Sequence, residues 1–390
     1  MTIVHKGFDG LDVAFRTNIS KELYDMLSGA KERAIEEHEP QLIEWNGVEM
    51  HVQSSGAQGY QFRCDTGPLG ATWFIKKPNV KDEWGIRVSC KSLPLAVRGL
   101  GRVRDDLHAF LDAIAGPVTV RDVSIGRVDY AVDILAPQFE LCSDNFVMHS
   151  SSKRTEFKDI ETHGTSGRTT GVRIGSMPFR QLAVYDKRAD IITKRKVEWW
   201  KIYNANLQAM GKPSLAPKDP EKSRVWRFEL RVGKCHLKDK WNLRTWEDLD
   251  NLLADVMRKL SEAIRYARPT QDSNRSRWPD DPLWAQVKDE IANDLAEMAS
   301  GIEPGVIKEI RRDELASLLL GQIVGLSATL SVLTDGDGEE QRDLPDLVAR
   351  GIERAQRFDR MEFERKRSKA KARYRFIDQI DTASAAEISG

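Results

Sequence analysis

The segment RQLAVYDKR (Arg180–Arg188) places a tyrosine two residues before a lysine in a run of alternating side chains. If this run is a strand, Tyr185 and Lys187 lie together on its polar face, opposite Leu182 and Val184. A phenol can attack a phosphodiester and form a phosphotyrosine ester, which a 3′-hydroxyl can reverse. Because the ordinary pKa of a phenol is about 10, the attack needs a neighbouring cation, and Lys187 can supply one. The alternative interpretation is an ordinary surface strand.

Two other segments, Ser124–Leu135 and Val225–Val232, alternate in the same way. Asp129 and Asp133 share one face of the first, and Glu229 lies on the corresponding face of the second. Carboxylates gathered on one sheet surface repel each other unless they share a cation. We therefore predict that these three bind Mg²⁺ or Mn²⁺, because the chain has no HExxH, HxH or CxxC pattern for zinc. Solvated charges on three unrelated strands are the alternative.

Basic side chains accompany these carboxylates and extend into the next segment. Arginines on the same strands can clamp phosphates, and the basic stretch from 194 to 201 surrounds Trp199, Trp200 and Tyr203, which could stack on unpaired bases. We favour the alternative that these aromatic residues are buried in an amphipathic helix. The residues expected to contact DNA are Arg127, Arg173, Arg180, Arg227, Arg231, Lys194, Arg195 and Lys196.

The charge of the chain is segregated although its formal net charge is zero. Residues 151–245 carry 22 Lys and Arg against 10 Asp and Glu, a net of +12, whereas residues 246–346 carry 11 against 22, a net of −11. A basic block in a neutral protein indicates a polyanion partner, and a solvated surface is the alternative. The run Arg365–Arg375 is a second basic segment, which we interpret as a tail that contacts duplex DNA or remains solvated.

Several other classes are excluded by pattern. The chain has no apolar run long enough to span a membrane, no signal-peptide pattern, and no Walker, GxGxxG or hydrolase signature. Its four cysteines are scattered, which favours a reducing cytoplasm. We therefore expect a cytoplasmic protein with no membrane partner.

The elements that must position these residues follow from periodicity. Strands alternate with two amphipathic helices, at about 19–39 and 95–114, and Asn46-Gly47 marks a hairpin. A further helical segment is expected at 191–211. Beyond residue 246 the pattern becomes helical, at 249–268, 283–299, 306–334 and 344–376. We therefore predict an α+β fold: an antiparallel-rich sheet with a polar catalytic face in residues 1–245, followed by a helical region, residues 246–390, with a basic tail.

Three motifs in order resemble the replication initiation factor family, which comprises rolling-circle plasmid and phage initiators and related relaxases. They are RVDYAVDI (Arg127–Ile134), GS followed nine residues later by YDK (Gly175–Lys187), and WRFELR (Trp226–Arg231), with DGLDVAF (Asp9–Phe15) similar to the family's first strand. The resemblance covers roughly residues 8–245. It departs from the family at Met177, where Arg is usual, and at Arg173, where an aromatic is usual.

The resemblance implies an enzyme that nicks origin DNA, single-stranded or in a hairpin, through a 5′-phosphotyrosyl intermediate and rejoins the strands. Tyr185 would be the nucleophile, and Asp129, Asp133 and Glu229 would bind the metal. A further ligand from the first strand is either Asp9, by motif, or Asp12, by alternation.

The family also implies a bacterial, plasmid- or phage-encoded protein, whose expected partners are a host helicase or polymerase and a second copy of the chain. The apolar helix at 306–334 independently suggests a homodimer. Two other functions remain open: a relaxase of a conjugative element with the same chemistry, and a non-catalytic origin- or operator-binding protein.

Overall fold

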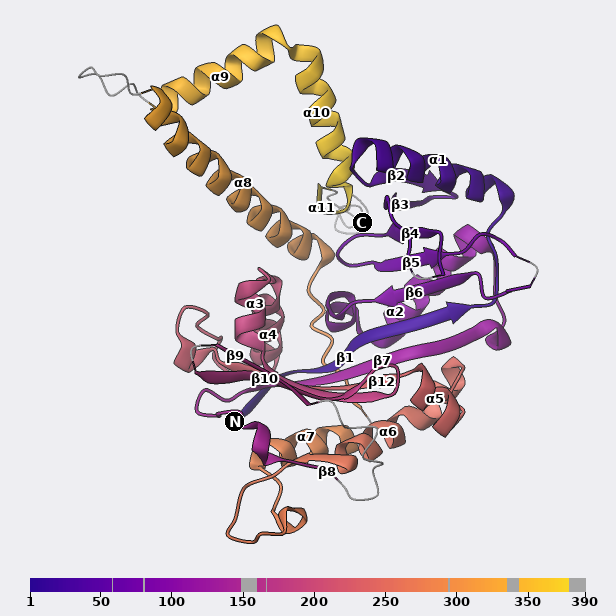
Figure 1. The fold of residues 1–390 in the computed structure, drawn as a ribbon, viewed down its shortest axis with the longest axis vertical. Helices are drawn as coiled ribbons and strands as arrows, with labels where there is room; N and C mark the ends of the chain where they lie inside the picture. Colours follow the sequence, from indigo (N-terminus) through magenta and orange to yellow (C-terminus); the bar gives the residue numbers. More distant parts are fainter. Residues whose placement is uncertain are drawn as a thin grey trace, which may run out of the picture.

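The computed structural model describes the chain except residues 58, 80, 149–159, 166, 294, 335–343 and 379–390. Eleven strands of the described part form one sheet in the order β2-β3-β4-β5-β6-β1-β7-β12-β11-β10-β9, and β8 pairs with β13 in a separate ribbon (Figure 1). Every pair of these strands is antiparallel. The α+β class with an antiparallel sheet and a helical C-terminal region is thus confirmed.

The bounds of the elements are as follows. The strands are β1 (Thr2–Phe15), β2 (Gln41–Trp45), β3 (Val48–Val52), β4 (Phe62–Asp65), β5 (Ala71–Ile75), β6 (Ile86–Cys90), β7 (Val123–Leu135), β8 (Phe146–Met148), β9 (Ile160–Thr165), β10 (Arg168–Ser176), β11 (Arg180–Asp186), β12 (Val225–Gly233) and β13 (Ile264–Tyr266). The helices are α1 (Lys21–Glu37), α2 (Ser92–Ala115), α3 (Lys187–Thr193), α4 (Glu198–Ala209), α5 (Lys234–Trp241), α6 (Trp246–Ala263), α7 (Pro282–Ala292), α8 (Pro304–Thr334), α9 (Leu344–Phe358), α10 (Arg360–Arg373) and α11 (Arg375–Asp378).

The local signals in the first half of the chain are confirmed. The hairpin between β2 and β3 turns at Asn46 and Gly47, which have φ values of 44° and 80°. Both central residues of such a two-residue turn require positive φ, which asparagine and glycine tolerate best. Helix α1 begins after Ser20, whose hydroxyl accepts a hydrogen bond from the backbone N–H of Leu23.

The long strands β1, β7, β12 and β11 have an apolar and a polar face, and each face is covered by helices. Helices α5, α6 and α7 lie on one side of these strands, and α3 and α4 lie on the other (Figure 1). On the apolar face, Phe228 and Tyr130 belong to the same buried cluster as Trp246 of α6 and Trp284 of α7. That cluster contains residues from both sides of position 245, and the division into domains there stays a prediction.

The single helix expected between residues 191 and 211 is divided in two. Strand β11 ends at Asp186, whose carboxylate accepts a hydrogen bond from the N–H of Ala189 and so caps α3. Arg195 then has a φ of 51°, and α4 begins at Glu198. The helix expected at 344–376 is likewise divided into α9, α10 and α11.

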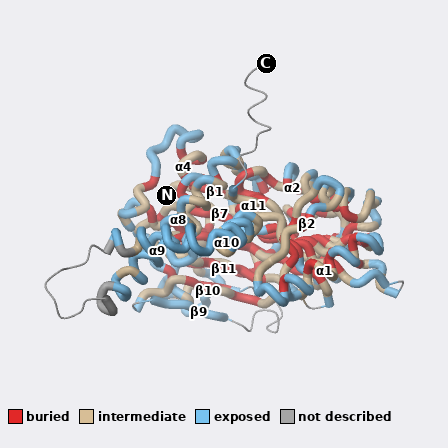
Figure 2. Tube along the Cα trace, turned by 90° about the horizontal axis from the view of Figure 1, so that it is seen from above, coloured by how far each residue is buried: buried red, intermediate tan, exposed pale blue. Residues whose placement is uncertain are grey.

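The last helices leave the body of the molecule and return to it. Helix α8 projects from the sheet, and α10 descends to α1 and β2 (Figure 1). The strands are largely buried, whereas α8, α9 and α10 are largely exposed (Figure 2). Among the described residues, no helix combines the length and apolar character needed to cross a membrane.

Candidate active site

Four polar side chains lie in one row across the polar face of the sheet. Asp133 of β7 is paired in register with His5 of β1 on one side and with Arg227 of β12 on the other. Arg227 is in turn paired with Tyr185 of β11. Because side chains at paired positions point to the same face, the register brings together the three strands whose polar faces the sequence singled out.

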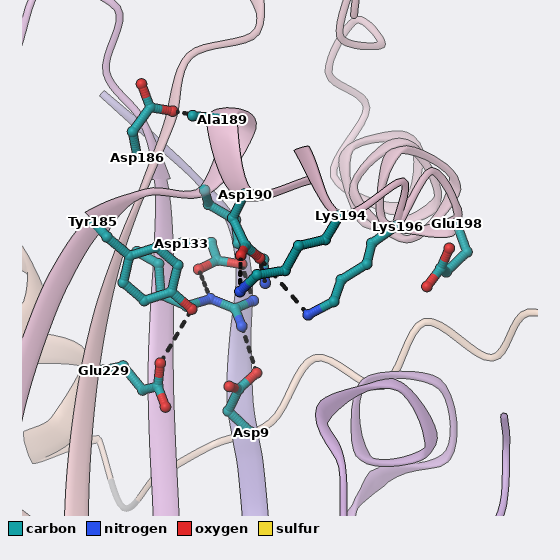
Figure 3. Close-up of polar contacts among 12 residues, drawn as sticks. Asp9, Asp133, Tyr185, Asp186, Ala189, Asp190, Lys194, Lys196, Glu198 and Glu229 are labelled. Atoms are coloured by element: carbon teal, nitrogen blue, oxygen red, sulfur yellow. Dashed lines mark hydrogen bonds and ion pairs between the residues drawn. The ribbon is translucent and has the colours of Figure 1, made fainter. Parts of the chain in front are cut away.

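Arg227 is the centre of this row and is completely buried. Its guanidinium donates to both carboxylate oxygens of Asp133 at 2.6 Å and also to Asp9 (Figure 3). Tyr203 of α4 donates to Oδ2 of Asp133 at 2.7 Å, and the ring of Trp199 lies 4.5 Å from the guanidinium. Although burial opposes ionisation, Arg227 lowers the pKa of Asp133. This arginine is therefore held by the protein, so its predicted role as a phosphate clamp has no support in this arrangement.

The hydroxyl group of Tyr185 contacts the neighbouring row of the sheet, in which Glu229 is paired with Ala183. The phenol donates a hydrogen bond to Oε2 of Glu229 at 3.1 Å (Figure 3). Arg231 holds the same carboxylate with two hydrogen bonds, at 2.7 and 2.9 Å. Burial, and then the negative charge of Glu229, raise the pKa of Tyr185 well above its usual value. The phenol is thus protonated at neutral pH, with a carboxylate in place to accept its proton.

Asp129 lies further along β7 and is held by an arginine of its own strand. Arg127 donates to both of its oxygens, with distances of 2.6 to 3.0 Å. Burial raises the pKa of Asp129 to about 7, against the opposing effect of Arg127. Asp129 is in register with Arg231 of β12, so Arg231 also contributes to this pair electrostatically.

A β-bulge in β1 determines where Asp9 and Asp12, the two candidate aspartates of this strand, lie on the sheet. The pairing of β1 with β7 shifts between Phe8 and Gly10, so one extra residue, Asp9, is accommodated there. The shift changes the parity of the alternation and places both Asp9 and Asp12 on the polar face. Asp9 contacts Arg227 in the row of Tyr185, whereas Asp12 is in register with Arg127 at the far end of the face.

Lys187 is not on the strand, as alternation predicted, but is the first residue of α3. It is nevertheless buried beside the tyrosine, with its ammonium 5.9 Å from the centre of the Tyr185 ring and 4.5 Å from that of Trp199. Asp190 of α3 lies 3.4 Å from it. Burial, and then the charge of Arg227, lower the pKa of Lys187 to about 8. A cation therefore lies beside the phenol.

A pocket of about 670 Å³ opens at this point of the face. Tyr185, Glu229, Arg231, Lys187 and Asp9 line it together with residues of β10 and α3. Gly171 of β10 is paired with Tyr185, and a Cβ there would lie 3.3 Å from the Cβ of the tyrosine, so the glycine keeps this side of the ring open.

The other residues predicted to contact DNA fall into two groups. Arg173, Lys194 and Lys196 line the pocket, with Arg173 held by Glu161 at 2.6 Å and Lys194 by Asp190 at 2.5 Å. Arg180 begins β11 in register with Val232, and Arg195 is exposed at the turn between α3 and α4. Neither of these two lines the pocket, and their contacts with DNA stay predictions.

The carboxylates predicted to bind a metal do not gather around one point. Within the described part of the chain, no three His, Cys, Asp or Glu side chains form a metal site. Asp129, Asp133 and Glu229 are each held by an arginine instead. The arrangement does not fit the predicted three-carboxylate site, and Mg²⁺ or Mn²⁺ binding stays a prediction.

Sequence reasoning missed the residues that cover the site. His5 is buried with its ring edge-on to Trp199, and burial lowers its pKa to about 4. Trp199, Trp200 and Tyr203 are buried, as favoured. The hydrogen bond from Tyr203 to Asp133 was not predicted. A helical pattern shows which side chains are buried but not which residues they contact.

No family model matches the chain, but individual proteins are similar to it. The uncharacterized protein ORF430 of Pseudomonas phage Pf1 is 27% identical over 207 residues, which cover 49% of this chain and 46% of that protein. The chain thus spans about half the length of this curated relative.

The solved structure of a rolling circle replication initiator protein from Geobacillus stearothermophilus is also similar. The likeness covers 76% of this chain and 99% of that chain, with a TM-score of 0.41 and 16% identity. The function below is argued from the residues of the site.

The site has the parts needed for a phosphoryl transfer to tyrosine. It holds a phenol with an adjacent proton acceptor, a lysine and an arginine that face the same pocket, and a buried ion-pair network beneath them. A phosphodiester in the pocket would meet cations on two sides of the phenol.

Proposed function

We propose that the chain cleaves and rejoins single-stranded DNA through Tyr185 and so initiates rolling-circle replication. The observation that carries the proposal is the hydrogen bond from the Tyr185 phenol to Glu229 in the wall of a pocket that Lys187 and Arg231 also line. The order of the three motifs supports an initiator rather than another phosphoryl-transfer enzyme.

In the proposed reaction, the oxygen of Tyr185 attacks the phosphorus of one phosphodiester while its proton passes to Glu229. The bond from phosphorus to the 3′-oxygen breaks, and that oxygen leaves as a hydroxyl after taking a proton from water. The 5′ side of the DNA remains on the tyrosine as a phosphotyrosine ester. Attack by a 3′-hydroxyl on this ester reverses each step and rejoins the strand.

The cations of the pocket lower the barrier by stabilising the charge that develops on the phosphate oxygens. Lys187 and Arg231 line the pocket with the phenol, and Arg231 also orients Glu229. The buried network of Arg227, Asp133 and Tyr203 touches no substrate and acts by positioning β11 and β12 relative to each other. A divalent cation would supply further charge neutralisation, and its requirement is a prediction to be tested by chelation.

Covalent capture tests the proposal. Labelled single-stranded oligonucleotides that tile the DNA around the coding region are incubated with the protein and Mg²⁺ or Mn²⁺, then denatured and separated by size. We expect a labelled protein band that survives denaturation and is absent with Tyr185→Phe. Binding of the same oligonucleotides with no adduct under any metal condition would favour the non-catalytic origin-binding function instead.

A relaxase of a conjugative element would give the same adduct. The two functions differ in the location of the captured sequence, at a replication origin or at a transfer origin. The expected partners, a host helicase and polymerase, belong to the initiator, because a polymerase extends the freed 3′-hydroxyl as its primer end.

A further inference from the structure

A second pocket, of about 460 Å³, lies where α8 and α11 meet the N-terminal half of the sheet. Its wall combines the aromatic rings of Tyr374 and Phe376 with the basic side chains of Lys91 and Arg311. Rings that stack on bases and cations that hold the backbone are the combination by which proteins bind single-stranded nucleic acid.

This pocket adjoins the pocket of Tyr185, because Ser92 and Lys196 line both of them. In the arrangement proposed below, a strand that leaves the tyrosine passes over these two side chains into the second pocket.

The balance of charge along the second pocket is positive. Its lining includes Lys91, Lys196, Arg311 and Arg373 against two carboxylates, Asp65 and Glu198. Glu198 is buried and is held by Arg311 at 2.6 Å, which fixes this wall. Lys91 is the most accessible of the cations, with 68% of its side chain exposed and Asp65 3.7 Å away.

The C-terminal wall of the pocket is docked by specific contacts. Lys369 pairs with Glu37, Arg373 with Glu39, and Arg375 with Glu49, at 2.7, 2.6 and 3.0 Å. Gly67 accommodates Phe376, because a Cβ at this glycine would lie 2.6 Å from the Cβ of the phenylalanine. The basic tail is thus partly neutralised by the acidic N-terminal region, and its aromatic end closes the pocket.

We propose that this pocket is a second subsite for single-stranded DNA, which holds a nucleotide on one side of the phosphodiester that Tyr185 attacks. The proposal rests on the proposed function for the identity of the ligand. It assigns the C-terminal segment Tyr374–Ile377 to the substrate path and not to a solvated tail.

The test compares two lysines in similar surroundings. Lys91 lines the subsite, whereas Lys222 lies outside both pockets, with 74% of its side chain exposed and Asp219 3.4 Å away. In full-length protein carrying Tyr185→Phe, which prevents adduct formation, the affinity for fluorescent oligonucleotides is measured as they are lengthened from the captured nick site in each direction. We expect lengthening in one direction to increase affinity about tenfold or more, Lys91→Glu to remove this gain, and Lys222→Glu to retain it.

A second measurement identifies the contact directly. Iododeoxyuridine is placed at successive positions of the longest oligonucleotide and photocrosslinked, and the linked peptide is identified by mass spectrometry. Crosslinks to the peptide that contains Tyr374 and Phe376, from one side of the nick site only, would support the subsite. Equal length dependence in Lys91→Glu and Lys222→Glu, or crosslinks confined to the Tyr185 pocket, would overturn it.

These experiments distinguish failure of the subsite from failure of the proposed nicking reaction. Failure of wild-type protein to form any adduct would count against the nicking reaction, whereas adduct formation with no length effect at Lys91 would count against the subsite alone. The melting temperatures of both lysine variants should equal that of their parent, because both side chains are exposed.

Discussion

Tyr185 and Glu229 lie on neighbouring strands, two residues out of register, and are joined by a 3.1 Å hydrogen bond from the phenol to the carboxylate. This diagonal contact gives the tyrosine a proton acceptor without using the row of Arg227 and Asp133, which is paired internally. In the proposed mechanism, adjacent rows of one sheet thus carry the chemistry and the structural support of the site.

The first prediction concerns the proton acceptor. Glu229→Gln keeps the size of the side chain but replaces one acceptor oxygen with an NH2 group and cannot take the phenol's proton. We expect the rate of adduct formation to fall about 100-fold or more, in the range typical for loss of a general base. Quenched time courses of adduct formation measure this, with Glu161→Gln, an exposed carboxylate of β9, as the control. A rate within threefold of wild type would assign the proton to another acceptor.

Arg227 gives a prediction on stability. Arg227→Gln leaves Asp133 and Asp9 without their cation in a buried setting, and we expect a loss of about 3–5 kcal/mol in the free energy of unfolding. Arg173→Gln, which breaks a partly exposed pair with Glu161, should cost less than about 1 kcal/mol. Urea unfolding of both variants tests the difference. Equal losses would mean that the buried network does not hold the strands together.

His5 makes stability depend on pH in the acid range. Its pKa in the folded protein is about 4, below the usual 6.5, because burial disfavours the charged ring. Between these pH values the unfolded chain binds more protons than the folded protein does. The contribution of neutral His5 to the free energy of unfolding, about 3 kcal/mol, is therefore complete above pH 6.5 and is lost as the pH falls to 4. Unfolding free energies of wild type and His5→Gln at pH 7 and pH 4.5 measure it. The variant should lose less stability than wild type over this interval; an identical loss would contradict the assignment.

The uncharged half of α8 predicts self-association. Leu319, Ile323, Leu326 and Leu330 are spaced four, three and four residues apart, and their exposed fractions are 43%, 46%, 71% and 36%. The spacing places Ile323 at an a position and Leu319 and Leu326 at d positions of a heptad, which favours a two-stranded coiled coil, and we propose a second copy of the chain as the partner. In sedimentation equilibrium, Ile323→Glu should shift the protein to monomer, whereas Val324→Glu, one residue outside the seam, should not. A wild-type protein that is monomeric at tens of micromolar would contradict the proposal.

The sequence was sufficient to predict the three strands, their polar faces and the residues that meet there. Alternation specifies the face of a side chain, and Tyr185, Arg227 and Asp133 accordingly lie in one row. The choice between Asp9 and Asp12 could not be made, because a bulge changes the parity of a strand and depends on pairing with a strand more than a hundred residues away.

Other features depend on tertiary contacts that no local pattern contains. Each carboxylate expected to share a metal is held by an arginine, and sequence spacing alone does not distinguish an ion pair from a ligand set. The position of Lys187 had a local signal that alternation concealed: Asp186 is a favoured helix-capping residue, so the strand ends there. The docking of the basic tail on Glu37, Glu39 and Glu49 required contacts across more than 300 residues.

The most direct test of the account is the site of covalent attachment. After nicking of a labelled single-stranded oligonucleotide, the adduct is digested with protease and nuclease, and the modified peptide is sequenced by tandem mass spectrometry. The account predicts a single nucleotide phosphate on Tyr185, and its absence in Tyr185→Phe. A nucleotide attached to another residue, or cleaved DNA with no attached protein, would contradict it.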